Sequence, residues 1–190
     1  MAILDWYGCA TFRLQTAGLN IFLDAYIDRA PHAQGTGLKA DDIDTCDWIL
    51  IGHSHFDHLY GAERIAANTG AKLVGSYETI RVMEQAGVPI EQMICVAGGE
   101  TLQLGPDVRV SVFPSQHSCV WTHTQMAPPD EVCLGDLGVT WQEQRERFAQ
   151  LVDFFGKGLT PEAVEHLGVS HQGDRGDGGA LIFLIETPEG

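Results

Sequence analysis

Basic side chains are scarce in this sequence of 190 residues. Eleven lysines and arginines stand against twenty-six aspartates and glutamates, which gives a formal net charge of −15. Such a charge repels nucleic acid and anionic membrane surfaces, so we expect no nucleic-acid partner, and a nuclease ranks below other classes of enzyme. A solubilising surface explains the excess of acidic residues better than an acidic interface does.

Long apolar runs and paired cysteines are also missing. No apolar stretch approaches the roughly 20 residues that span a bilayer, and the first residues lack the basic and apolar parts of a signal peptide. We therefore expect no membrane span and a cytoplasmic location. The five cysteines include no C-x-x-C pair, which argues against a disulfide framework and a zinc ribbon. A hydrophobic fraction of 44% predicts one folded domain over residues 1–190.

Histidine, by contrast, is concentrated in one short segment. His53, His55 and His58 are three of the eight histidines, and Asp57 lies among them. Residues 48–51 are apolar and typical of a buried strand, which Gly52 ends. In extended backbone, His53 and His55 point to the same side, so one ion can bind both. Asp57 and His58 follow where the chain should turn into a helix, and they can serve a second, adjacent ion. This donor set suits zinc first, with manganese or iron as alternatives.

The spacing H-x-H-x-D-H resembles the metal-binding motif of the metallo-β-lactamase superfamily. The resemblance implies an αββα sandwich, a fold of the α/β class. It also implies that His117, just past a predicted strand, is the third ligand of the ion bound by His53 and His55. The family's bridging aspartate and last histidine would lie beyond Gly190. The resemblance therefore implies mainly the N-terminal half of the sandwich, either as a fragment or as a shortened homologue.

The opening of the chain resembles one branch of this superfamily. Residues 5–11, together with Ile21 to Asp24, are similar to the branch that contains L-ascorbate-6-phosphate lactonase and N-acyl-phosphatidylethanolamine phospholipase D. That branch usually has histidine where this chain has Cys9. Asp24 either orients the metal-binding loop from behind its ligands or serves as an ordinary turn aspartate; both interpretations are open.

The rest of the chain alternates between strand and helix patterns, as in an α/β layer. Turn residues separate the segments, and Ser76 is placed to cap the second helix. The predicted helices cover residues 59–69 and 77–86. The predicted strands cover residues 3–7, 11–16, 20–23, 48–51, 72–75, 93–96, 101–104, 108–113 and 180–186.

Residues 119–179 read as a helical insertion packed over the site. Phe148, Leu151, Val152 and Phe155 form the stripe of an amphipathic helix, and Thr160 with Pro161 begins a second helix. His32, Trp121, His123 and Met126 are weaker candidates for lining a pocket. His171, Asp174 and Asp177 lie in a glycine-rich segment that we interpret as a loop.

The candidate metal ligands predict a metal-dependent hydrolase that uses a metal-bound hydroxide. The resemblance implies that its substrate is a small-molecule ester, lactone or phosphoester. Asp57 would be a ligand or the catalytic proton acceptor, and one or two zinc ions would be the cofactor. Two other classes remain open: a non-catalytic metal-binding domain and an iron-dependent, oxygen-using metalloprotein. The expected partner is a small-molecule substrate, and a homo-oligomer is compatible with the sequence.

Overall fold

The computed structural model describes most of the chain. It covers residues 1–29, 34–117 and 179–190, together with positions 140, 142, 143, 145, 146, 149, 153, 160, 161 and 164. The stripe residues Phe148, Leu151, Val152 and Phe155 lie outside the described residues, and so does the segment 170–178. The predicted insertion over residues 119–179 therefore stays a prediction, although Gln142, Glu143 and Arg145 are helical.

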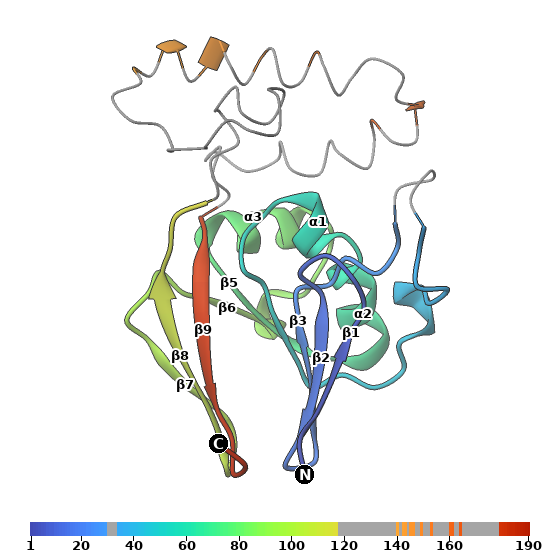
Figure 1. The fold of residues 1–190 in the computed structure, drawn as a ribbon, viewed down its shortest axis with the longest axis vertical. Helices are drawn as coiled ribbons and strands as arrows, with labels where there is room; N and C mark the ends of the chain where they lie inside the picture. Colours follow the sequence, from blue (N-terminus) through green and yellow to red (C-terminus); the bar gives the residue numbers. More distant parts are fainter. Residues whose placement is uncertain are drawn as a thin grey trace, which may run out of the picture.

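The first layer is a six-stranded sheet whose strands follow the order of the chain (Figure 1). Short β-branched and aromatic segments alternate with turn residues, and each of them forms a strand. The first three strands are antiparallel, and β3 to β6 are parallel. The strands are β1 (Ile3–Trp6), β2 (Phe12–Thr16), β3 (Leu19–Leu23), β4 (Trp48–Leu50), β5 (Lys72–Gly75) and β6 (Met93–Cys95).

Helices cover one face of this sheet. They are α1 (Phe56–Leu59), α2 (Ala62–Thr69) and α3 (Tyr77–Gln85), with single 3-10 turns at Ala40–Asp42 and Ile90–Gln92. The helix predicted over residues 59–69 is interrupted because Gly61 has φ 110°, a left-handed conformation that ends α1 and begins α2. The predicted cap of α3 is confirmed, since the Ser76 hydroxyl accepts a hydrogen bond from the backbone N–H of Thr79. Ile49, Leu73 and Ile65 are fully buried between sheet and helices.

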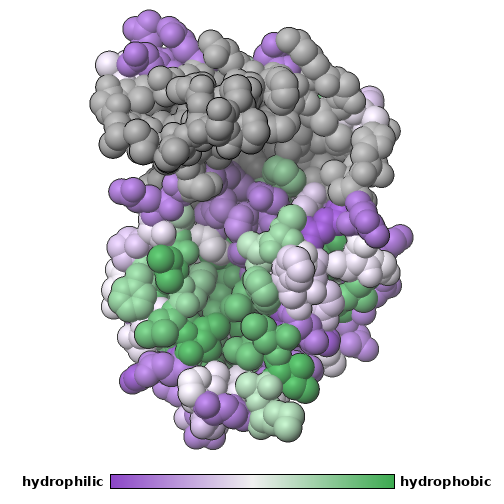
Figure 2. All heavy atoms as spheres, viewed as in Figure 1, coloured by the Kyte–Doolittle hydropathy of each residue, from purple (hydrophilic) through white to green (hydrophobic). Residues whose placement is uncertain are grey.

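The second layer is a three-stranded antiparallel sheet packed on the other face of the first. It consists of β7 (Thr101–Gly105), β8 (Val108–Pro114) and β9 (Leu181–Glu186). Alternate residues of β8, namely Val108, Val110 and Val112, are fully buried against the first sheet, as the period of two along a strand requires. Figure 2 shows apolar side chains gathered between the two sheets, with polar side chains above them at one edge.

The layers confirm an α/β sandwich, and no strand end lies more than one residue from its predicted position. Because β3, β4, β5 and β6 run in parallel, the segments after them reach the same edge of the sheet. The described residues include no helix long and apolar enough to cross a membrane.

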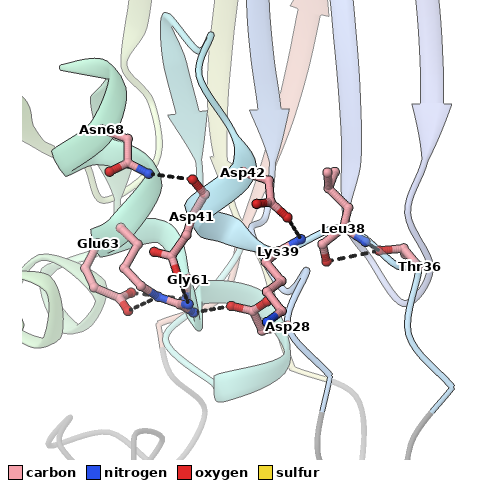
Figure 3. Close-up of polar contacts among 10 residues, drawn as sticks. Asp28, Thr36, Leu38, Lys39, Asp41, Asp42, Gly61, Glu63 and Asn68 are labelled. Atoms are coloured by element: carbon pink, nitrogen blue, oxygen red, sulfur yellow. Dashed lines mark hydrogen bonds and ion pairs between the residues drawn. The ribbon is translucent and has the colours of Figure 1, made fainter.

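One arginine fastens the segment after β3 to the helical layer. Arg64 on α2 forms ion pairs with Asp28, Asp41 and Glu63, and Figure 3 shows these three carboxylates around one guanidinium. Asp41 belongs to the 3-10 turn, and Asn68 donates a hydrogen bond to its carbonyl. Asp28 and the 3-10 turn Ala40–Asp42 are thereby held against α2.

Candidate metal centre

The histidine-rich loop begins where β4 ends at the edge of the first sheet. Ile51 is fully buried, and its N–H donates to the carbonyl of Val74 beside it. His53 follows Gly52 and is 8% exposed. His55 is the N-cap of α1, so Asp57 and His58 lie within this four-residue helix rather than before it. The helix begins three residues earlier than predicted, and this turn brings Asp57 and His58 back toward His53.

The first candidate ligand group brings together His53, His55 and His117. One nitrogen from each imidazole lies within 4.8 Å of the others, and the three ring centroids are 4.6 Å apart pairwise. His117 follows β8 in the second sheet. Two backbone hydrogen bonds hold this part of the chain in place: Ser115 N–H donates to Ala180, and Leu181 N–H donates to Gly52.

The second candidate group contains His53, Asp57 and His58, whose ligand atoms also lie within 4.8 Å of one another. The rings of His53 and His58 are 3.8 Å apart between centroids. Because one nitrogen binds one ion, His53 cannot complete both groups through the same atom. All five predicted ligands therefore meet at one place, and His53 lies between the two groups.

Asp24 lies directly behind His58. One oxygen of its carboxylate is 2.6 Å from Nδ1 of His58, and the other accepts a hydrogen bond of 2.7 Å from the N–H of Gly52. Asp24 has φ 55°, in the left-handed region that is uncommon for aspartate. A Cβ at position 52 would make only ordinary van der Waals contact with the Asp24 carboxylate, at 3.4 Å, so this approach does not depend on glycine. Because Nδ1 of His58 lies against Asp24, the other ring nitrogen, Nε2, faces Asp57 and is 3.8 Å from its Oδ2.

Burial and neighbouring charges set the protonation of these groups. Burial lowers the pKa of His53 from 6.5 to about 2, and the positive charges of His58, His55 and His117 act in the same direction. His53 is therefore neutral at physiological pH, the form in which imidazole binds a metal. Burial also opposes protonation of His58, but the hydrogen bond and charge of Asp24, with the charge of Asp57, raise its pKa above the ordinary value. Burial raises the pKa of Asp24.

The residues fit a metal ion on their own chemistry. Nε2 of His53 is buried, and it has no hydrogen-bond partner in the described part of the chain. A buried polar atom without a partner is costly unless a ligand satisfies it. Imidazole and carboxylate are the common zinc donors. The Asp24 carboxylate contacts one ring nitrogen of His58 and leaves the other for a metal ion. A carboxylate in this position orients a metal-binding histidine.

Several weaker candidates are not placed by the structure. His32, Trp121, His123, Met126, His171, Asp174 and Asp177 lie outside the described residues. Cys9 is described and exposed, with φ 47°, and its carbonyl accepts a hydrogen bond from the indole of Trp6.

Sequence reasoning missed two charged side chains near this edge. Glu78, in the first turn of α3, is only 4% exposed. Arg29, after β3, stacks on the ring of Tyr26. A glutamate in a first helical turn and an arginine in a loop are both common surface features, so neither carried a signal.

Comparison with known families gives one match over most of the chain. Residues 19–149 match the beta-lactamase superfamily domain. A metal-dependent hydrolase from Pyrobaculum arsenaticum is 35% identical over 117 residues, which is 60% of this chain and 50% of that protein. A metal-dependent hydrolase from Anaeromyxobacter dehalogenans is 36% identical over 123 residues, which is 63% of this chain and 44% of that protein.

Solved structures give weaker similarities. A metallo hydrolase from the archaeon Ignicoccus hospitalis has a TM-score of 0.46 and 24% identity, over 62% of this chain and 50% of that one. CmlA, a diiron β-hydroxylase from Streptomyces venezuelae, has a TM-score of 0.48 and 20% identity, over 62% of this chain and 24% of that one.

The family match covers β3, β4 and the whole histidine-rich loop, as well as His117. The chain spans about half the length of the curated relatives it matches. The matched residues include all five of the predicted metal ligands, on the α/β sandwich described above. This chain therefore belongs to the metallo-β-lactamase superfamily.

Proposed function

We propose that the chain forms the metal-binding part of a metal-dependent hydrolase that acts on a small-molecule ester, lactone or phosphoester. One observation carries the proposal: five donor side chains form two groups of three that share His53, and the ligand atoms within each group lie within 4.8 Å of one another. Burial keeps the shared His53 neutral. Curated relatives named as metal-dependent hydrolases support it.

Each residue has a distinct part in the proposed site. His53, His55 and His117 hold one ion, and Asp57 with His58 contributes to a second. When bound, such an ion lowers the pKa of a coordinated water to about 7 and polarises the oxygen of the scissile group. Water is then the nucleophile, so no serine or cysteine is needed at this place.

Asp57 is the residue we assign to proton transfer. Its side chain is 41% exposed and lies at the start of α1, beside the buried His53 and the half-buried His58. A carboxylate there can accept the proton of the attacking water and return it to the leaving group. Asp24 has a positioning role, because its hydrogen bonds to His58 and Gly52 set the direction in which the His58 ring faces.

The choice of metal follows from the donor set, and the choice of substrate follows from a sequence resemblance. We propose zinc as the metal, because imidazole outnumbers carboxylate among the ligands. A lactone-like substrate is proposed from the resemblance of residues 5–11 and 21–24 to the lactonase branch. The cytoplasmic location and a homo-oligomeric state stay predictions.

Metal content and turnover together test the proposal. The purified protein should contain one or two zinc ions per chain and hydrolyse at least one of three probes: 4-nitrophenyl acetate, γ-butyrolactone and bis(4-nitrophenyl) phosphate. At matched metal content, Asp57→Ala should lower kcat/KM by about 100-fold or more, the usual worth of a general base.

Asp47→Ala is the matched control. Its carboxylate accepts a hydrogen bond from Asn20 N–H at the opposite end of the first sheet, so turnover should be unchanged. Bound zinc without hydrolysis of any probe would contradict the proposed activity and favour a non-catalytic metal-binding domain. Iron with visible absorbance would favour the oxygen-using class instead.

A further inference from the structure

Arg29 lies on the same edge of the molecule as the metal centre. The segment that carries it follows β3 and contacts the metal loop twice: Ala25 N–H donates to the carbonyl of His58, at 2.6 Å, and the ring of Tyr26 meets Phe56 edge-on, at 5.5 Å between centroids. Phe56 lies between His55 and Asp57 in the sequence. The Arg29 guanidinium stacks on the Tyr26 ring, 4.4 Å from its centroid.

The guanidinium of Arg29 is incompletely satisfied. Its Nη2 donates a hydrogen bond of 2.6 Å to the carbonyl of Tyr7. Its Nη1 is buried, and no described residue forms a hydrogen bond with it. A buried N–H group of a permanent cation without an acceptor is costly, and arginine is suited to bind an anion with two parallel hydrogen bonds.

Other arginines of the described residues contrast with Arg29. Arg13, Arg64 and Arg109 each form an ion pair with a carboxylate. No ion pair is found for Arg29 among residues 1–29, 34–117 and 179–190, although the chain has twenty-six acidic residues. In so acidic a chain, a buried guanidinium nitrogen without an anion is therefore notable.

The guanidinium is also held in place from two sides. A Cβ at Gly8, which has φ 88°, would lie 2.9 Å from Nη2 of Arg29, so the turn after β1 lies directly against the guanidinium. Phe12 pairs with Leu23 in register, which places this turn beside the end of β3 and thus at the edge of the metal centre. The cation is fixed before any ligand arrives, which reduces the entropic cost of binding.

We propose that Arg29 is a specificity-determining residue that binds an anionic group of the substrate, a carboxylate or a phosphate, away from the bond that is cleaved. The inference rests on the proposed hydrolase function and narrows its substrates to esters or lactones that carry a second, negatively charged group. The Tyr26 ring and the Tyr7 carbonyl hold the guanidinium, and Nη1 supplies the hydrogen bond to the anion.

Binding of inorganic phosphate tests Arg29 without turnover. Isothermal titration at matched metal content should show at least tenfold weaker phosphate binding in Arg29→Gln than in the unmodified protein, with Arg29→Lys in between because it keeps the charge but not the planar fork. Arg13→Gln is the control, since it removes the same charge from a nearby residue that already pairs with Asp5. Equal phosphate affinity in Arg29→Gln, or no phosphate binding by the unmodified protein, would overturn the inference.

A pair of esters of similar length distinguishes an anion-binding role from a structural one. The ratio of kcat/KM for mono-4-nitrophenyl adipate to that for 4-nitrophenyl hexanoate should fall more than tenfold in Arg29→Gln, mainly through KM. A purely structural role predicts equal losses on both esters and an unchanged ratio, which would overturn the inference. If the unmodified protein hydrolysed neither ester, the proposed function would fail for this substrate class, while phosphate binding would still decide the role of Arg29.

Discussion

The two ligand groups are close in space but depend on different parts of the fold. His53, Asp57 and His58 lie within one loop and the short helix that follows it, and Asp24 supports them from the end of the neighbouring strand. His53, His55 and His117 combine that loop with a residue that follows the second sheet. The second group is therefore a local structure, whereas the first forms only when two sheets pack together.

The packing that supports the first group is mostly apolar. Val108, Val110 and Val112 on β8 are fully buried against the first sheet, and the indole N–H of Trp48 on β4 donates to the carbonyl of Leu104 on β7. Burial of a valine side chain contributes on the order of 2 kcal/mol. Substitutions can therefore weaken one ligand group and leave the other intact, and the following predictions are ordered by the size of that effect.

Removal of the shared histidine should have the largest effect. His53→Ala removes the side chain that is common to both candidate groups, whichever ion it binds, so metal affinity should fall by more than the roughly 10–100-fold that is typical for loss of an outer-shell partner. Elemental analysis after dialysis should find almost no zinc. A variant that kept two ions per chain would show that His53 is not a ligand of either group.

Removal of an unshared histidine should separate the groups. His117→Ala should leave one ion, because His53, Asp57 and His58 keep their positions, whereas His58→Gln should leave the ion of the first group. Glutamine at position 58 retains a donor toward Asp24, which limits the cost of an unpaired buried carboxylate. Cobalt substitution followed by visible spectroscopy should show a different remaining spectrum in each variant. Identical spectra would mean that the five residues form a single site.

Loss of the carboxylate behind His58 should have an intermediate effect. Asp24→Asn keeps the shape and an acceptor for Gly52 N–H but removes the charge that supports the His58 ring. Affinity of the second group should fall by about 10–100-fold, with little change in the first. Zinc titration against a chromophoric chelator would measure both, and Asp47→Asn, far from the metal centre, is the matched control.

Most of this architecture was predictable because local chemistry determines it. The strand Lys72–Gly75 has the predicted bounds, and Ser76 caps α3, as its position just before that helix predicts. Gly61 was harder to interpret, because a glycine within a helical pattern is often tolerated and only the backbone reveals its φ of 110°.

In the candidate site, too, the local sequence predicts some of the contacts, whereas others depend on how distant segments pack. The four candidate ligands within residues 53–58 follow from their spacing after a buried strand. His117 lies 4.6 Å from His55 between ring centroids, yet nothing in the residues around it determines that contact, which depends on how β8 packs. Asp24 could be a turn residue or a support for the loop, and only the 2.6 Å contact with His58 distinguishes them.

The smallest effect should come from core substitutions far from the ligands. Val110 on β8 and Val82 on α3 are both essentially unexposed, but they lie in different cores, the first between the sheets and the second beneath the helices. Each change to alanine should cost roughly 2 kcal/mol of unfolding free energy, measured by urea denaturation. Only Val110→Ala should also weaken the first ligand group, by a few-fold in cobalt titration, because β8 carries the chain to His117. Equal weakening by Val82→Ala would mean that global stability, and not the packing of the second sheet, controls where His117 lies.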